Sequence, residues 1–229
     1  MKTKIKVTET IENYLESIYN MRDEGKQVIA ARLAERLGVK PPTVSQTLQR
    51  MKRDGLIKID DGQITLTKLG LEVAEAGIRR HRVVERFMTD ILGLEWAVAH
   101  REAEAIQYTM SDLVEQKMFE ALGHPAACPH GNPIPGVQST RLPPEALTLD
   151  TAEAGQRVQV LRITEEGERD PRLLGYLQKN RLVPGAIVAV KEVAPWSGVV
   201  TLNRGDEIIP IGLKAARTIW IQPAHAASA

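Results

Sequence analysis

The chain has 229 residues, with 30 Lys and Arg against 29 Asp and Glu, giving a formal net charge of +1. This balance excludes binding to nucleic acid through overall charge, so such a role needs a local basic patch. Only two Phe are present, which argues against a stacking platform for single strands. The single cysteine, Cys128, excludes an intramolecular disulfide and fits a reducing compartment.

No apolar run approaches the roughly 20 residues that span a bilayer, and the N-terminal residues lack the apolar stretch of a signal peptide. We therefore expect a cytoplasmic protein without a membrane partner. The length allows one to three domains.

The first part of the sequence predicts a helix-turn-helix. Apolar residues at helical spacing indicate helices over 8–21 and 28–37. Gly38 then marks a stop, and Pro41–Pro42 suit the first turn of a third helix. Val44, Leu48 and Met51 form the buried stripe of that helix, and polar side chains occupy its other faces. These side chains are Thr43, Gln46, Thr47, Gln49, Arg50 and Arg53.

A β-hairpin is expected directly after this helix. Leu56–Ile59 and Ile64–Thr67 flank Asp60-Asp61-Gly62, a turn signal that makes the module winged. Between Lys40 and Lys58 five basic residues face one acidic residue, a net charge of +4. Gln can pair with adenine, and Ser or Thr can contact bases or phosphates. We interpret the module as binding double-stranded DNA; binding to a protein is the alternative.

The stretch from His81 to Tyr108 carries a candidate metal site. His81 and Glu85 are four residues apart on one predicted helix. His100, Glu104 and Gln107 share a face of the next one. Imidazoles, carboxylates and an amide on neighbouring stripes can close around a divalent cation. Pairs of this kind are also common on solvated faces, so spacing alone leaves both interpretations open.

The middle region, with one long helix over 73–92 and one or two more over 95–122, has more apolar residues than it can bury alone. A homodimer would bury them, and its two-fold axis would suit two DNA half-sites. After these helices, Cys128-Pro129-His130 offers a thiolate and an imidazole in a Pro-rich loop. A buried cysteine beside a surface histidine is the alternative.

The last part of the chain predicts a small barrel. Strand patterns occur at 157–163, 186–193, 199–202, 207–211 and 218–221, with one short helix at 171–180. Short strands with Gly and Pro turns over this length are typical of an SH3-like barrel. Docking of a Pro-rich peptide is discounted, because Trp196 and Trp220 are the only tryptophans there.

This order of parts resembles the diphtheria toxin repressor family, with its iron-dependent and manganese-dependent branches. The resemblance is strongest in PTVSQTLQRMKRDGLI, HRVVERFMTDILGL and GNPIPG. It implies a mainly α fold with a small β domain. The implied parts are a winged helix-turn-helix over 1–71, a helical metal-binding and dimerisation domain over 72–138, a linker over 139–149, an SH3-like (FeoA-like) domain over 150–223 and a tail over 224–229.

The family's ancillary metal site matches His81, Glu85 and His100, with Asp170 as the candidate from the barrel. Iron-type members add a Gln three residues after that acid, where this chain has Leu173. One ligand of that branch is therefore missing.

The family's primary metal site shows the main departure. It matches Asn13, Glu104, Gln107 and Tyr108, where other members usually have Asp or Met, Cys or Glu, Glu, and His. Some manganese-type members recruit a Cys-Pro-His loop to the metal. We therefore expect a site built from Glu104, Gln107, Cys128 and His130, with Asn13 and Glu16 as further candidates.

The resemblance implies a metal-dependent transcriptional regulator and not an enzyme, a repressor of metal-uptake genes that binds a palindromic operator as a homodimer. Mn²⁺ is favoured, with Fe²⁺ next and Zn²⁺ or Cd²⁺ able to bind in vitro. One rival is a regulator with a degenerate primary site that binds DNA constitutively or answers another ligand. The other is a metallohydrolase, but this sequence lacks the HExxH motif of such enzymes. The implied DNA-contacting residues are Lys40, Pro42, Thr43, Ser45, Gln46, Thr47, Arg50 and Arg53.

Overall fold

The computed structural model describes residues 7–137 and 142–224. The chain divides into two compact units, one ending at Arg80 and one beginning at His81. The predicted tail beyond residue 224 and linker residues 139–141 lie outside the described residues.

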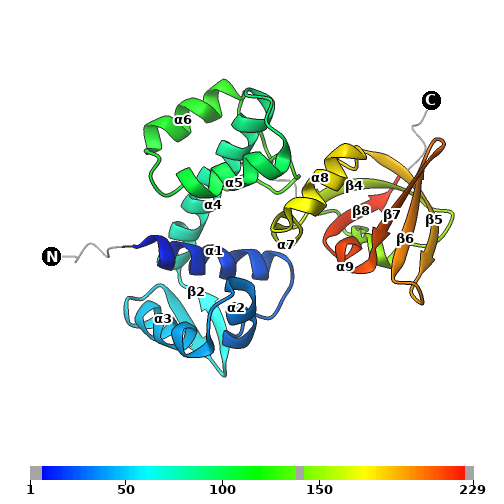
Figure 1. Ribbon diagram of the computed structural model, residues 1–229. Helices are drawn as coiled ribbons and strands as arrows, with labels where there is room; N and C mark the ends of the chain where they lie inside the picture. Colours follow the sequence, from blue (N-terminus) through cyan, green and yellow to red (C-terminus); the bar gives the residue numbers. More distant parts are fainter. Residues whose placement is uncertain (1–6, 138–141, 225–229) are drawn as a thin grey trace. The chain divides into compact units, whose positions relative to one another are not determined.

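The first unit contains the predicted helix-turn-helix and hairpin (Figure 1). Its elements are α1 (Glu9–Asp23), α2 (Ala30–Leu37), α3 (Pro41–Arg53), β1 (Ile57–Asp60), β2 (Gln63–Leu66) and the start of α4 (Lys68–Asp90). β1 and β2 pair antiparallel, with Ile57 opposite Leu66. The predicted helices and the hairpin are therefore confirmed.

Local sequence signals set these boundaries. The side chain of Thr8 caps α1 by accepting a hydrogen bond from the amide of Ile11, at 3.4 Å. α2 ends at Gly38, which adopts the left-handed conformation. Pro41 stands in the first turn of α3, and the stripe containing Leu48 is buried against the core of this unit.

The second unit begins within α4 and includes α5 (Trp96–Ile106) and α6 (Asp112–Ala121). The expected segment 95–122 is thus two helices. Ser111 caps the second by accepting a hydrogen bond from the amide of Val114, at 3.4 Å. Several large apolar side chains remain exposed here, as expected if this region associates with a second copy. They are Ile91, Leu92, Leu113 and Val114.

The rest of the second unit is a small β domain, as predicted (Figure 1). Its strands are β3 (Leu147–Thr148), β4 (Arg157–Ile163), β5 (Ile187–Ala194), β6 (Val199–Arg204), β7 (Glu207–Gly212) and β8 (Ile219–Pro223), in the order β3-β8-β4-β5-β6-β7. All neighbouring strands are antiparallel. The helices are a 3-10 turn at Leu149–Thr151, α7 (Glu165–Glu168), α8 (Pro171–Lys179) and α9 (Leu213–Ala216).

Helix α5 and the β domain share one hydrophobic core. Trp96 is buried among core residues of the β domain, and its amide donates a hydrogen bond to Oε1 of Gln178 on α8 at 2.9 Å. The short helix α7, which the sequence did not predict, begins after Thr164, whose hydroxyl caps Gly167. This packing brings α7 to the helices that carry the predicted metal ligands. Within 7–137 and 142–224, no helix is long and apolar enough to cross a membrane.

Two helical glycines provide a test of packing in this fold. A Cβ built on Gly70 in α4 would lie 1.9 Å from the carbonyl oxygen of Leu56, whereas one on Gly175 in α8 would meet nothing within 4 Å. We expect Gly70→Ala to lower the free energy of unfolding by about 1–3 kcal/mol, because the backbone must move.

The matched Gly175→Ala variant should be neutral or more stable by up to about 1 kcal/mol, because alanine favours the helix. Urea unfolding followed by circular dichroism measures both changes. A Gly70→Ala protein as stable as the parent would show that α4 does not approach the backbone of Leu56 this closely.

Candidate metal centre

Four buried side chains from three helices meet in the second unit. His81 and Glu85 come from α4, His100 from α5 and Glu168 from α7, and one ligand atom of each lies within 4.8 Å of all the others. The spacing of four residues puts His81 and Glu85 on one face of α4, as the sequence predicts. Glu85 is 0% exposed and Glu168 is 1% exposed, so two carboxylates are removed from water here.

Glu85 lies at the middle of this group. Its Oε1 is 2.6 Å from Nδ1 of His100 and 3.1 Å from Nε2 of His81. The two imidazole nitrogens are 3.3 Å apart. Nδ1 of His100 is also 3.8 Å from Oε2 of Glu168. Two imidazoles and two carboxylates thus face a common point, which is a donor set suited to a divalent transition metal.

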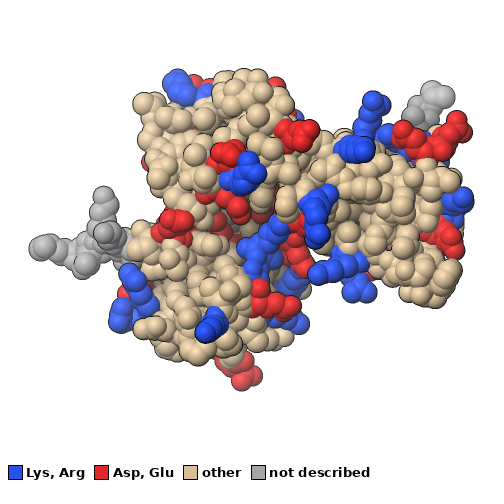
Figure 2. Space-filling model, viewed as in Figure 1, with Lys and Arg blue, Asp and Glu red and all other residues tan. Residues whose placement is uncertain are grey.

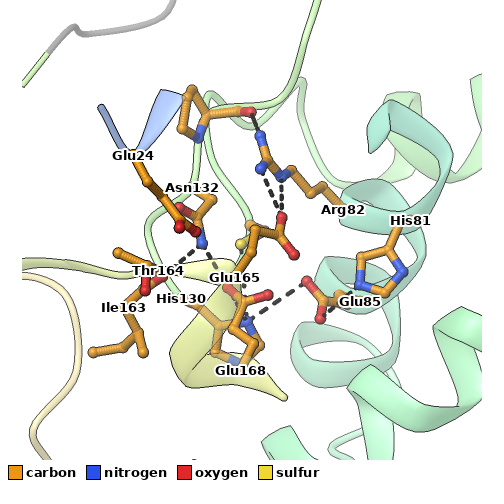
Figure 3. Close-up of polar contacts among 12 residues, drawn as sticks. Glu24, His81, Arg82, Glu85, His130, Asn132, Ile163, Thr164, Glu165 and Glu168 are labelled. Atoms are coloured by element: carbon orange, nitrogen blue, oxygen red, sulfur yellow. Dashed lines mark hydrogen bonds and ion pairs between the residues drawn. The ribbon is translucent and has the colours of Figure 1, made fainter. Parts of the chain in front are cut away.

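A second group shares the same glutamate. Ligand atoms of Glu85, Cys128 and His130 also lie within 4.8 Å of one another. Nδ1 of His130 is 3.6 Å from Oε2 of Glu85, 3.1 Å from Oε1 of Glu168 and 3.9 Å from Sγ of Cys128. Figure 3 shows Glu85 between His81 on one side and His130 on the other. The Cys-Pro-His loop therefore joins the cluster through Glu85.

The loop 126–134 is held against the β domain by its backbone. The amide of Cys128 donates to the carbonyl of Asn132 at 2.9 Å, and the amide of Ile163 on β4 donates to the carbonyl of His130 at 2.8 Å. Gly131 has φ +88°, and a Cβ there would lie 2.4 Å from the carbonyl oxygen of Leu161. Only glycine fits this close approach, which fixes Cys128 and His130 in place.

Several polar atoms of the cluster fit a bound ion. Oε2 of Glu85, Nε2 of His130 and Oε2 of Glu168 are buried and have no hydrogen-bond partner among the described residues. Leaving buried polar atoms unsatisfied is costly, and such groups call for an explanation. A bound ion that takes these atoms as ligands would explain why they have no hydrogen-bond partner. The residues present therefore fit a divalent metal.

Gln107 orients one of the imidazoles. Its Oε1 is 2.6 Å from Nδ1 of His81, and both side chains are buried. Because a carbonyl oxygen only accepts, Nδ1 carries the proton in this contact and Nε2 faces Glu85. Metal-binding histidines usually donate their second ring N–H in this way. The structure thus places Gln107 beside a candidate ligand.

Electrostatic interactions in the cluster favour charged side chains. Burial alone lowers the pKa of His81, but attraction to Glu85, Glu165 and Glu168 outweighs it and raises that pKa to about 10. Burial likewise opposes the charge of His130, whose pKa is nevertheless raised well above its usual value by Glu168 and Glu85. Burial raises the pKa of Glu85, and His81 and His130 more than reverse this, so it lies well below its usual range. In the metal-free protein, a proton on His81, whose pKa is raised to about 10, supplies positive charge beside Glu85.

Two predicted ligands are not among the buried side chains of the cluster. Asp170 caps α8, where its Oδ1 accepts hydrogen bonds from the amides of Arg172 and Leu173, and its side chain is 45% exposed. Glu168, two residues earlier, stands where Asp170 was expected, because α7 turns it inwards. Glu104 is 60% exposed, with its Oε1 3.7 Å from Nε2 of His100.

The remaining predicted ligands belong to the first unit. Asn13 on α1 is exposed and Glu16 is half-buried. Glu16 lies against Gly77 of α4, where a Cβ would be 2.1 Å from its Oε1. Asn13 and Glu16 both lie in the first unit, and their role as ligands stays a prediction.

The predicted DNA-contacting residues mostly lie on the exposed face of α3. Those exposed are Lys40, Pro42, Thr43, Ser45, Gln46, Arg50 and Arg53. Thr47 is half-buried, and its hydroxyl donates to the carbonyl of Thr43 at 3.0 Å. On the face in view in Figure 2, basic and acidic side chains are interspersed. The last turn of α3 carries the basic residues Arg50, Lys52 and Arg53.

Comparisons with known proteins match nearly the whole chain. Residues 6–61 match the iron dependent repressor N-terminal DNA binding domain, residues 67–136 match the iron dependent repressor metal binding and dimerisation domain, and residues 147–223 match the FeoA domain. The iron-dependent repressor IdeR of Mycobacterium tuberculosis is 36% identical over 94% of this chain and 98% of its own length. The chain belongs to the iron-dependent repressor family.

The diphtheria toxin repressor of Corynebacterium diphtheriae is 34% identical over the same shares of both chains. Among solved structures, a manganese-dependent transcriptional repressor in complex with manganese matches with a TM-score of 0.82 and 30% identity, covering 93% of this chain and all of that one. ScaR with bound Zn²⁺ matches with a TM-score of 0.78 and 26% identity. The predicted family and fold class are confirmed. The protein is a metal-dependent DNA-binding repressor of this family, whose matched domains imply a DNA operator and a homodimer.

The raised pKa values predict that metal binding depends on pH. An ion bound at this cluster would have to displace the protons of His81 and His130, so we expect affinity for Mn²⁺ to rise between pH 6 and 9, by roughly tenfold per pH unit for each proton released. Isothermal titration calorimetry in buffers of different ionisation enthalpy measures both affinity and protons. An affinity independent of pH, with no proton release, would contradict this assignment.

The metal-free protein should show the opposite trend in stability. The pKa of His81 rises from 6.5 to about 10 on folding. The contribution of this histidine to the free energy of unfolding is therefore fully present below pH 6.5 and is lost as the pH rises through 10.

Proposed function

We propose that this repressor is activated by a divalent ion held at the buried cluster of α4, α5 and α7. His81, Glu85, His100 and Glu168 would provide one set of ligands, and Glu85, Cys128 and His130 the other. The observation that supports this proposal is that both sets share Glu85. Its Oε1 faces His81 and His100, and its Oε2 faces His130. Each set would hold an ion, with Glu85 contributing one oxygen to each set.

We propose Mn²⁺ as the activating ion, with Fe²⁺ as the alternative. Carboxylate oxygens and imidazoles of the first set suit Mn²⁺ and Fe²⁺, whereas the Cys128 thiolate favours Fe²⁺ or Zn²⁺. Similar proteins include both an iron-dependent repressor and a manganese-dependent repressor. Regulation of metal-uptake genes would follow from either ion.

When bound, the metal would supply positive charge and ligand bonds joining three helices and the loop 126–134. The side chains prepare the cluster for it: Gln107 orients His81, and the backbone contacts of the loop fix His130. Activation requires that the ion bind the DNA-competent state more tightly than the inactive state. Because the ligands come from separate segments, only a conformation that brings all of them together can satisfy the ion.

The DNA would be read by α3 from each subunit of a homodimer. Ser45 and Gln46 are exposed near the start of this helix, where recognition helices contact base edges. Arg50 and Arg53 at its end suit phosphates. A two-fold dimer would read a palindromic operator, and the exposed apolar residues that follow α4 and lie on α6 support such a dimer.

A repressor that has lost metal control is the second candidate function. Gln107 and Tyr108 stand where relatives usually carry ligands. The buried cluster argues against this candidate, because its ligand groups form without Tyr108 and Gln107 contacts His81, one of their members.

The decisive variant is Glu85→Gln. We expect at least tenfold more Mn²⁺ to be needed for half-maximal operator binding, because both ligand sets lose a charged oxygen, while binding in EDTA stays at the parent's low level. Fluorescence anisotropy with the protein's own upstream region measures this, with EDTA, Mn²⁺, anaerobic Fe²⁺ and Zn²⁺ in turn. The ranking of the ions decides between manganese and iron.

Glu192→Gln, an exposed glutamate on β5, is the matched control and should behave like the parent. Glu104→Gln tests the alternative that the activating ion binds at Glu104. If Glu104→Gln abolishes activation and Glu85→Gln does not, the activating site lies at Glu104. Equal binding of the parent in EDTA and in metal would favour the repressor without metal control.

A further inference from the structure

The outward face of α3 carries a glutamine that the DNA contacts proposed above do not include. The opposite face of this helix is buried through Val44 and Leu48. Side chains spaced at i, i+4, i+7 and i+11 share one face of a helix. In α3 that spacing selects an exposed stripe made of Pro42, Gln46, Gln49 and Arg53. Gln49 therefore lies between a proposed base contact and a proposed phosphate contact.

Two members of this stripe have polar side chains that are free to bind. Within residues 7–137 and 142–224, neither Gln46 nor Gln49 has a side-chain hydrogen bond or ion pair. Arg53 differs, because its Nε lies 3.5 Å from Oδ1 of Asp54, which balances part of its charge. The side chain of Pro42 is apolar. The stripe therefore offers a ligand two amides about one helical turn apart.

An amide is the side-chain group that matches adenine. It presents an acceptor and donors in one plane, so a glutamine can bond N6 and N7 of adenine together in the major groove. A helix rises about 1.5 Å per residue, which separates Gln46 from Gln49 by about 4.5 Å along its axis. Stacked base pairs are about 3.4 Å apart. The two amides are therefore spaced to reach neighbouring base pairs.

We propose that Gln49 is a second specificity-determining residue, which reads an adenine next to the base pair read by Gln46. The inference rests on the proposed function, in which α3 of each subunit lies in the major groove. It adds one base pair to the part of each half-site that the protein reads directly. Because the dimer is two-fold, the same adenine would recur at symmetric positions of the palindrome.

The distribution of charge along α3 favours a base contact over a phosphate contact for this side chain. Arg50, Lys52 and Arg53 lie in the last turn of the helix, and cations supply the attraction to phosphates. Gln49 is uncharged and precedes all three. A glutamine can also bond a phosphate oxygen, but such a contact carries no sequence information. The sequence preference of the protein therefore distinguishes the two roles.

The experiment selects DNA duplexes from a pool that contains a randomised segment, using the full-length protein with Mn²⁺, and sequences the bound fraction. We expect Gln49→Ala to lower the enrichment of adenine at one position of each half-site by about fivefold or more, and to leave the other positions unchanged. Gln49→Arg should replace that adenine with guanine, because arginine bonds O6 and N7 of guanine.

Gln116→Ala is the matched control. Gln116 is an exposed glutamine of α6 whose side chain donates to Oε1 of Glu120 at 3.0 Å, and this variant should select the parent's motif. Gln49 is exposed and alanine favours helices, so both alanine variants should fold, which circular dichroism checks.

The inference is wrong if Gln49→Ala selects the parent's motif without change. It is equally wrong if that variant binds every sequence more weakly by the same factor, because Gln49 would then contact a phosphate or only support the helix.

Gln46→Ala separates this inference from the proposed function. If Gln46→Ala changes the selected motif and Gln49→Ala does not, only the role of Gln49 fails. If the parent selects no motif with Mn²⁺, or if neither variant changes the motif, α3 does not read the operator and the proposed reading by this helix fails as well.

Discussion

The structure of the second unit depends on one buried carboxylate. Glu85 is completely buried and is surrounded by the imidazoles of His81, His100 and His130. A charge in such a place is stable only with partners. In the metal-free protein these partners are the three imidazoles, and the same carboxylate helps to raise the pKa of each of them. A divalent cation can replace protons on these imidazoles, so the fold and the candidate metal site share one electrostatic requirement.

This requirement explains why the β domain belongs to the site. Helices α4 and α5 alone contribute His81, Glu85 and His100. The remaining donors come from the loop 126–134 and from α7, which are held by β4, by Asn132 and by Arg82. Burial of Trp96 in the core of the β domain joins α5 to the same body. A divalent ion that contacts all of these segments at once would bind only when they are correctly arranged, which is what regulation by the ion requires.

Most of the fold could be predicted from the sequence, because helical spacing, Gly and Pro signals and strand alternation act locally. For the same reason, the sequence predicts His81 and Glu85 on one face of α4 and His100 on α5. Glu168 was missed because α7 is one short turn whose orientation depends on the tertiary packing of the β domain. Asp170 was favoured instead, yet its local preference for capping α8 keeps it exposed. The grouping of Cys128 and His130 with Glu85, rather than with Glu104, likewise depends on long-range contacts that no local pattern contains.

The central claim is that the divalent ion binds at Glu85. Anomalous diffraction from crystals grown with Mn²⁺, recorded above and below the manganese absorption edge, tests it most directly. We predict an anomalous peak within bonding distance of Glu85, His81 and His100, and a second peak beside Cys128 and His130 at higher metal concentration. A peak beside Glu104, with none at Glu85, would contradict the account.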